Sequence, residues 1–512
     1  MAQDQDQTIA FLMRAQSYGS TGNVERIDTH CALVFLIGDR AFKLKRAVKF
    51  PYLDYSSPAL RKRACQAELR LNRRTAPGIY LEVRPINRLA SGQLTFEAGG
   101  TPVDWVVVMQ RFDQGDLFDM LAARNQLTHD MLRRLTDKVV EFHASAERTT
   151  EHGGSSAMRA VIAGNQENMA LGHAVISQDL AKRLTHMSLA ALDKVSPVLD
   201  ARQISGEVRR CHGDLHLGNI CLFKGEPTLF DCIEFSDDIA CTDVYYDLAF
   251  LVMDLWQRNL KAEANQVFNR YIDMTSDTPG VVAMPLFLSI RAALRAHVCA
   301  AASTNQPSVA KRLQKQADAQ HYLLEGIELL QPRNPCLIAI GGLSGTGKST
   351  LAQALACDLG LPPGARVLRS DVVRKRIRDV SPETRLSKDA YTIAQMARVY
   401  QDLAARAACN VASGYAVVID AVFAKAEERL AIEEVARKAG IPFFGLWLTA
   451  PTSVLEERLQ KRQMDASDAT IEVLHRQLDY AVGALGDWQA IDAGGDFMHT
   501  LELARSAIGK AI

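Results

Sequence analysis

A glycine-rich loop between a predicted strand and a predicted helix constrains this chain more than any other feature. Its residues follow the pattern G-x-x-x-x-G-K-S/T from Gly342 to Ser349. The apolar run 336–340 before the loop is typical of a buried strand, and helical spacing begins at Lys348. Glycines let backbone N–H groups turn inward around a phosphate, and the helix N-terminus favours the same anion. The sequence therefore predicts an α/β P-loop NTPase domain.

Different residues of the loop are predicted to bind different parts of a metal-bound nucleotide. Lys348 would supply a positive charge to the β and γ phosphates, and Ser349 would supply a hydroxyl to Mg²⁺. We therefore expect ATP and Mg²⁺ as cofactors. The residues predicted to contact the nucleotide are Gly342, Ser344, Gly345, Thr346, Gly347, Lys348, Ser349 and Thr350.

Two aspartates follow other predicted strands of this domain. Asp371 comes after the strand 366–368, where it could act as base for an acceptor hydroxyl or merely cap the next helix. Arg374 shares its helix face and is predicted to bind a negative group of the acceptor. Asp420 ends the strand 416–419, where it could hold Mg²⁺ or cap a loop.

A basic pair marks the helix that follows the strand 443–448. Arg458 and Arg462 are four residues apart and share one helix face. They could close over the transferred phosphate, but a solvated helix face explains them almost as well. Strands and helices alternate from residue 336 onward, which predicts a parallel sheet covered by helices on both faces.

The length of 512 residues exceeds what one hydrophobic core usually serves, so at least two domains are expected. The segment 331–335 reads Gln-Pro-Arg-Asn-Pro and breaks a helical stretch. We place the domain boundary there, with one domain at 1–330 and the P-loop domain at 335–512.

Composition favours a cytoplasmic protein that is not embedded in a membrane. The ten cysteines are scattered without a C-x-x-C pair, and the amino terminus resembles no secretory signal. The apolar stretch 281–302 contains Arg291 and Arg295, which are costly in a lipid-spanning helix. The formal net charge is zero, so no global basic field exists to bind nucleic acid broadly.

The first 330 residues change from a strand-like to a helical pattern near residue 110. Alternation at 29–48 around a turn at 37–40 predicts a hairpin, and a helix at 57–74 and a strand at 105–109 follow. Helical spacing then dominates, at 117–146, 175–199, 240–272 and 285–302. We therefore expect an α+β domain of two lobes, a sheet lobe at about 1–110 and a helical lobe at about 111–330.

The segment 212–219 reads His-Gly-Asp-Leu-His-Leu-Gly-Asn and lies between strand-like stretches. Asn219 follows Asp214 by five positions, the spacing by which a kinase catalytic loop presents both residues to one phosphate. Asp214 is predicted to accept the proton of an acceptor hydroxyl, while Asn219 and Asp231 bind Mg²⁺. His212 is expected to brace the loop, and the role of His216 stays open.

A lysine for the nucleotide phosphates is expected on the second strand of the hairpin. Lys43 could reach the α and β phosphates and pair with Glu68, unless Glu68 is an ordinary exposed helix charge. Lys45 points the same way and competes for the role. No G-x-G-x-x-G is present, and Gly19 and Gly22 are a weak substitute.

Residues 25–325 resemble the aminoglycoside phosphotransferase and choline kinase superfamily, whose H-G-D-x-H-x-x-N loop stands intact at 212–219. The resemblance implies a bilobal protein-kinase-like fold with ATP between the lobes. It also implies that Asp243 and Asp247 support the catalytic loop or wall the acceptor cleft.

The last third resembles small P-loop kinases, a group that includes polynucleotide 5′-kinases, gluconate kinase, chloramphenicol phosphotransferase and zeta-type toxins. This resemblance rests on the loop, on Asp371 with Arg374, and on the pair Arg458 and Arg462, and it implies that Asp371 is the acceptor base. The complete order resembles a bacterial family that fuses the two kinds of domain.

The leading hypothesis is an enzyme that uses MgATP at two sites to phosphorylate hydroxyl groups of an acceptor expected to be a small molecule. A second hypothesis makes the first domain a nucleotide- or ligand-binding module that regulates the P-loop kinase. A third is a P-loop kinase or ATPase acting on polynucleotide ends, which the neutral net charge does not favour. Acceptor identity, antibiotic modification and oligomeric state stay open.

Overall fold

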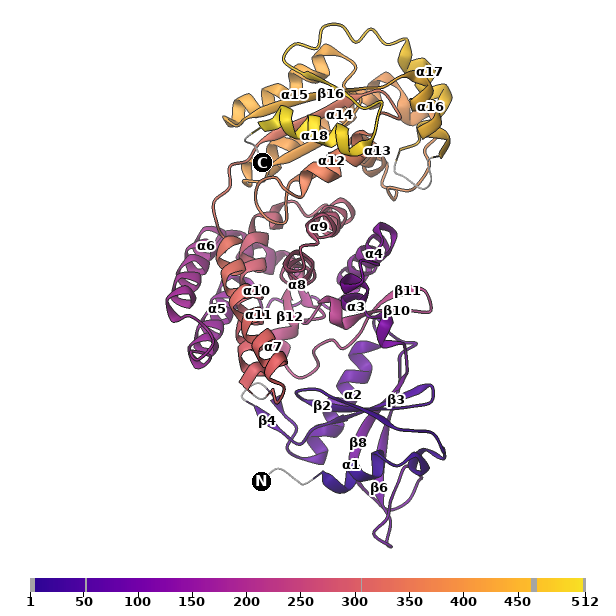
Figure 1. Ribbon diagram of the computed structural model, residues 1–512, viewed down its shortest axis with the longest axis vertical. Coiled ribbons are helices and arrows are strands. Elements are labelled where there is room, and N and C mark those ends of the chain that lie inside the picture. The colour runs from indigo at the N-terminus through magenta and orange to yellow at the C-terminus, as the bar shows by residue number, and fades with distance from the viewer. Residues whose placement is uncertain (1–4, 51–52, 305, 462–466, 510–512) are drawn as a thin grey trace. The chain divides into compact units, whose positions relative to one another are not determined.

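The computed structural model describes residues 5–50, 53–304, 306–461 and 467–509 (Figure 1). It forms two compact units. Unit 1 contains residues 1–158 and 199–251, and unit 2 contains residues 159–198 and 252–512. This division by compactness differs from the domain boundary expected at 331–335, which stays a prediction.

Unit 1 contains a six-stranded antiparallel sheet in the order β1-β2-β3-β8-β6-β7, of which β2, β3, β6 and β8 are labelled in Figure 1. In β8, Val106 and Val108 pack with the residues around Phe11 of α1, while Val107 packs on the opposite face with Cys65 of α2. Both faces are buried, which explains why the strand reads as a continuous apolar run. The elements are α1 (Asp6–Leu12), β1 (Glu25–Asp28), β2 (Ala32–Ile37), β3 (Arg40–Lys45), β4 (Lys49–Phe50), β5 (Leu53–Asp54), α2 (Pro58–Asn72), β6 (Tyr80–Arg88), β7 (Leu94–Thr95) and β8 (Thr101–Gln110).

The rest of unit 1 is mainly helical, with short strands that carry the 212–219 loop. Its elements are α3 (Phe118–Ala123), α4 (His129–Ser145), β9 (Val208–Arg210), β10 (Ile220–Phe223), β11 (Glu226–Leu229), α7 (Asp237–Ala240) and β12 (Cys241–Asp243), followed by most of α8 (Val244–Gln257). The helix expected at 117–146 is interrupted between α3 and α4. Asn125 adopts a φ of +54°, and the side chain of Thr128 caps α4 by accepting from Met131 N at 3.2 Å.

The helices of unit 2 that precede its sheet include a long apolar one. Residues Pro279–Thr304 are long and apolar enough to cross a membrane, but 72% of their most apolar window is buried inside the protein. Arg291 is itself buried there, so this stretch has the burial of a core helix. The helices are α9 (Lys261–Thr275), α10 (Met284–Thr304) and α11 (Val309–Glu328), while α5 (Gly154–Leu171) and α6 (Gln178–Ser205) contain residues of both units.

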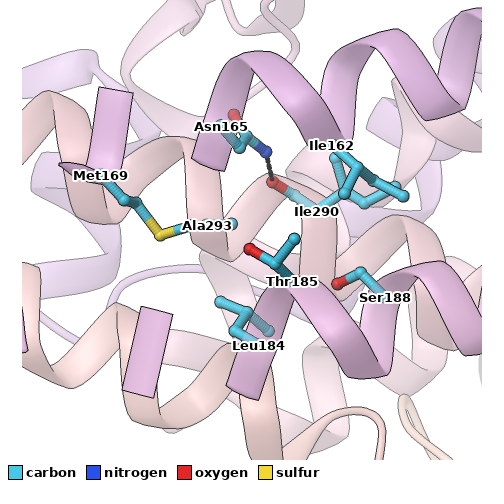
Figure 2. Close-up of a pocket in the computed structure, with 8 residues that line it drawn as sticks. All are labelled: Ile162, Asn165, Met169, Leu184, Thr185, Ser188, Ile290 and Ala293. Carbon is cyan, nitrogen blue, oxygen red and sulfur yellow. Dashed lines mark hydrogen bonds between the residues drawn. The ribbon is translucent and has the colours of Figure 1, made fainter. Parts of the chain in front are cut away.

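A small cavity lies among α5, α6 and α10 in unit 2 (Figure 2). Asn165 donates to the main-chain oxygen of Ile290 at 3.1 Å, and Met169, Leu184 and Ala293 contribute apolar wall. Its volume of about 10 Å³ suits a single water molecule and nothing larger. We therefore treat it as a packing void.

The P-loop part of unit 2 is a five-stranded parallel sheet in the order β14-β15-β13-β16-β17. In β13, Ile338 and Ile340 pack with residues of α12 and α18, whereas Leu337 and Ala339 pack with residues of α14 and α15. This is the expected sheet with helices on both faces. The elements are β13 (Leu337–Gly342), α12 (Lys348–Ala356), β14 (Arg366–Arg369), α13 (Ser370–Ile377), α14 (Ile393–Ala412), β15 (Val417–Asp420), α15 (Ala426–Ala439), β16 (Phe443–Thr449), α16 (Thr452–Lys461), α17 (Ile471–Leu478), β17 (Gln489–Asp492) and α18 (Phe497–Ile508).

Candidate active sites

The first candidate site, in unit 1, contains two lysines of β3 and a glutamate of α2. Lys43 Nζ lies 2.7 Å from Glu68 Oε1, and Lys45 Nζ lies 2.5 Å from Glu68 Oε2. Lys43 also lies 2.5 Å from Asp231 Oδ1, whereas Lys45 contacts Glu234, which accepts from Tyr55 Oη. Glu68 is therefore a buried partner of both lysines, and only Lys43 contacts the predicted metal ligand.

The charges of this cluster hold one another in the ionised form. Burial by itself lowers the pKa of Lys43, but the carboxylates of Asp231 and Glu68 outweigh it and raise that pKa above its ordinary value. Burial would raise the pKa of Glu68, but Lys43 and Lys45 lower it to about 2. Lys43 is thus a fixed positive charge beside Asp231, as phosphate binding requires.

The 212–219 loop brings its predicted aspartate and asparagine together. Asn219 Nδ2 donates to Asp214 Oδ2 and to Asp214 main-chain oxygen, both at 2.9 Å. Asp214 keeps 38% of its side chain exposed, and His216 Nε2 lies 3.4 Å from its carboxylate. Asp231 adopts a φ of +62° and is also part-exposed. The carboxylates predicted to meet acceptor and metal are therefore accessible.

Buried side chains support the 212–219 loop through hydrogen bonds. Asp247 accepts from Gly213 N at 2.8 Å and from His212 N at 3.1 Å, and it contacts His143 Nε2 at 3.0 Å. His212 Nε2 lies 2.9 Å from Phe230 main-chain oxygen, and burial lowers the pKa of His212 so that the ring is neutral at pH 7. Asp247 thus occupies a supporting position. Asp243 pairs instead with Arg202, at 2.7 Å.

The second candidate site is the P-loop at the end of β13. Ser349 Oγ lies 2.6 Å from Asp420 Oδ2, which joins the two residues predicted to hold Mg²⁺. Lys348 Nζ donates to Leu343 main-chain oxygen at 2.8 Å. Gly345 adopts a φ of +88°, and a Cβ there would lie 2.8 Å from Leu455 oxygen, so the loop needs glycine at that position. These oxygen donors and inward-turning glycines fit a metal-bound triphosphate.

The predicted acceptor residues lie together on α13. Arg374 donates to Asp371 Oδ1 at 2.6 Å and stacks over the ring of Tyr391, 4.6 Å from its centroid. Tyr391 Oη donates to Asp468 at 2.6 Å, and Lys375 Nζ lies 3.3 Å from Asp468. A segment before α14 and one before α17 therefore meet beside Asp371 and Arg374.

The predicted arginine pair can be followed only at Arg458. Arg458 donates to Gly495 main-chain oxygen at 3.1 Å, and Arg462 lies outside the described residues. Two residues that sequence reasoning missed do contact P-loop elements. Arg369 donates to Ser349 Oγ at 3.1 Å and lies 3.4 Å from Asp420, and Gln477 Oε1 accepts from Ser344 N at 2.8 Å.

Two family models match the chain. Residues 34–283 match the model described as the phosphotransferase enzyme family, and residues 337–483 match an AAA domain. The chain is 30% identical over 469 residues to an uncharacterized protein of Mycobacterium tuberculosis strain H37Rv, and the alignment covers 89% of this chain and 90% of that protein.

Two further proteins are similar to parts of the chain. An adenylyl-sulfate kinase of Myxococcus xanthus strain DK1622 is 28% identical over 164 residues, which cover 32% of this chain and 81% of that kinase. A solved structure of a thermostable mutant of aminoglycoside phosphotransferase APH(4)-Ia is 14% identical, with a TM-score of 0.37, and covers 62% of this chain and 98% of its own.

Proposed function

The chain and its mycobacterial relative belong to a family in which a phosphotransferase-enzyme-family domain is fused to a P-loop kinase-like AAA domain, and we propose that the chain transfers the γ-phosphate of MgATP to hydroxyl groups at two sites. Both domains belong to kinase and phosphotransferase families. The acceptor in this proposal is a small molecule. The reaction is proposed to be cytoplasmic, which suits ten free thiols.

At the first site, Lys43 holds the α and β phosphates, and Asn219 and Asp231 supply oxygen ligands to Mg²⁺. Asp214 receives the proton of the acceptor hydroxyl, and its bond from Asn219 fixes the orientation of the carboxylate. Bound Mg²⁺ neutralises the charge that develops on the phosphate oxygens. Asp247 acts at a distance by holding the main chain of the loop.

At the second site, Lys348 and the inward N–H groups hold the phosphates, while Ser349 and Asp420 supply the metal ligands. Asp371 receives the acceptor's proton, and Arg374 keeps that carboxylate in place or binds an anionic group of the acceptor. The Arg374 guanidinium lies over the ring of Tyr391, so the proposed acceptor subsite has one aromatic wall.

One observation carries the proposal. At each site, two residues that were separately predicted to bind phosphate or metal come from distant parts of the sequence and yet are in contact. Lys43 and Asp231 are 2.5 Å apart across 188 residues, and Ser349 and Asp420 are 2.6 Å apart across 71 residues. A chance motif in either domain would not bring these pairs together.

The test is phosphoryl transfer from radiolabelled MgATP to pooled hydroxylated acceptors, with products separated by chromatography. The pool contains sugars, polyols, amino alcohols, aminoglycosides and adenylyl sulfate, the last because of the name of the Myxococcus relative. We expect labelled acceptor whose formation stops when EDTA removes the divalent metal. Acceptor-independent phosphate release alone would contradict the proposal.

Matched variants assign a product to a site. Asp214→Asn should lower formation of one product by about 10²-fold or more, as loss of a general base does, and Asp371→Asn should do the same for the other. The control variants are Asp238→Asn and Asp379→Asn, which change exposed aspartates close in sequence to Asp231 and to Asp371. Equal effects of a control and its partner variant would remove the assigned role.

A further inference from the structure

A small polar cavity lies at the β14 edge of the parallel sheet, on the face of α13 opposite Asp371 and Arg374. We call it the arginine-lined cavity. Its polar lining is Asp273 of α9 and four arginines, namely Arg366, Arg369, Arg376 and Arg406. All of these residues belong to unit 2.

The positive charge of this cavity is incompletely neutralised. Arg366 pairs with Asp273 at 3.0 Å, Arg406 with Asp402 at 2.6 Å, and Arg369 lies 3.4 Å from Asp420. Among the described residues, Arg376 forms no ion pair. At least one guanidinium group of the cavity, that of Arg376, therefore lacks a carboxylate partner in the described part of the chain.

Two further observations favour an anionic ligand at this cavity. Arg366 is only 3% exposed, and its Nε is buried without an acceptor among the residues that the structure describes. Burial, and to a lesser extent the positive charge of Arg406, lowers the pKa of Arg376. A buried donor that lacks an acceptor is costly, so a ligand that accepts hydrogen bonds would be stabilised here.

We propose that the arginine-lined cavity binds a phosphate group, and that the bound group draws Arg369 away from the predicted metal site. Guanidinium groups match phosphate oxygens in charge and in bidentate geometry. The cavity of about 10 Å³ admits only a water-sized group as it stands. Arg376 and Arg406 are only partly buried, with 22% of the Arg406 side chain exposed, and rotation of these side chains would open the space that a phosphate group needs.

The consequence for the second site follows from the position of Arg369. Its guanidinium contacts Ser349 and Asp420, where a positive charge opposes the binding of a cation. A phosphate in the arginine-lined cavity would attract the guanidinium of Arg369 away from Ser349 and Asp420, because Arg369 also lines the cavity. Phosphate binding should therefore strengthen binding of the metal and nucleotide, and by reciprocity they should strengthen phosphate binding. This coupling rests on the proposed function, but the phosphate site does not.

The binding test uses inorganic phosphate and the full chain in a Lys348→Ala background, so that the P-loop contributes little. Equilibrium dialysis with labelled phosphate should show saturable binding that the double change Arg376→Ala and Arg406→Ala weakens by about tenfold or more. Arg378→Ala is the control, since Arg378 lies just past α13 and pairs with Asp389 outside the cavity. Unchanged binding in the double variant would overturn the site.

Two further measurements separate a failure of folding from a failure of phosphate binding, and test the coupling to the nucleotide site. If the double variant fails to fold, Arg376→Gln alone should still weaken phosphate binding, and an unchanged affinity would count against the site. In the chain with Lys348 intact, phosphate should tighten Mg²⁺-dependent binding of a nonhydrolysable ATP analogue. Phosphate binding without that tightening would overturn the coupling, whereas phosphate binding in a chain that binds no ATP analogue would contradict the proposed function and leave the site standing.

Discussion

We expect the two lysines of β3 to have different roles, with Lys45 mainly stabilising the fold and Lys43 mainly binding the nucleotide. Lys45 lies between the buried carboxylates of Glu68 and Glu234, and breaking a buried pair costs about 3–5 kcal/mol. Chemical denaturation should therefore show a large loss of stability for Lys45→Ala. Lys43→Ala leaves Glu68 its second lysine but should weaken binding of an ATP analogue at the first site by about tenfold or more.

Binding to the first site is measured in a Lys348→Ala background, where the P-loop is disabled. If Lys45→Ala weakens the binding and Lys43→Ala does not, Lys45 is the phosphate-binding lysine and the assignment is reversed.

The low pKa of Glu68 predicts a specific acid sensitivity. Its folded-state pKa of about 2 lies below the ordinary 4.5, so its contribution is complete above pH 4.5 and is lost as the pH falls towards 2. A shift of that size corresponds to a contribution on the order of 3 kcal/mol. Urea denaturation between pH 5 and pH 3 should show a shallower loss of stability in Glu68→Gln than in the wild type.

The exposed Glu82 provides the control for this measurement. Glu82→Gln should keep the wild-type dependence on pH. Identical slopes for the wild type and Glu68→Gln would mean that Glu68 does not carry the linkage.

Site residues that belong to one local motif could be predicted from the sequence. Site residues that a distant segment contributes could not. Asp214 and Asn219 stand five positions apart, and the structure places them in contact. Gln477 reaches Ser344 from 133 residues away, and nothing local marks it. Arg369 did offer a signal, because it directly precedes Ser370-Asp371 at the end of a strand, where side chains meet the P-loop.

At the scale of elements, the turn from β13 into α12 depends on Gly345. A Cβ at this position would meet the main chain of α16, and the positive φ adds strain. Gly345→Ala should therefore weaken binding of an ATP analogue at the second site by about tenfold or more, as calorimetry in a Lys43→Ala background can measure.

Gly440→Ala is the matched control for the loop variant. Gly440 has a φ of +66° and open space around its Cβ position, at the end of α15. This variant should cost about 1 kcal/mol of stability and leave nucleotide binding unchanged. Equal binding losses in the two variants would show that backbone strain alone, and not the clash with α16, disturbs the site.

Strands with apolar runs were predictable, including the edge strand β14, whereas the edge strand β17 and the interruptions of long helices were not. The expected strands at 336–340, 416–419 and 443–448 correspond to β13, β15 and β16. The edge strand β17 was missed because Ile491 is its single buried residue, which leaves no alternation to detect. The helix expected at 240–272 is divided between α8 and α9, where Asn259 adopts a φ of +62°.

At the scale of the whole chain, the central question is whether both sites transfer phosphate. The second hypothesis, in which the first domain only regulates the P-loop kinase, predicts the same family matches. The third, a kinase of polynucleotide ends, predicts steeply salt-dependent binding of an oligonucleotide. Because the formal net charge is zero, we expect no such binding at low ionic strength in a filter-binding assay. Salt-sensitive oligonucleotide binding would favour the third hypothesis.

The most direct measurement compares transfer of the γ-phosphate from MgATP to pooled acceptors by the native chain, Asp214→Asn and Lys348→Ala. Each variant disables one proposed site and leaves the other intact. We expect each variant to abolish a different part of the turnover, and the double variant to abolish both. If Lys348→Ala alone removes all transfer and Asp214→Asn changes nothing, the first domain is a regulatory module and the claim of two phosphotransferase sites is wrong.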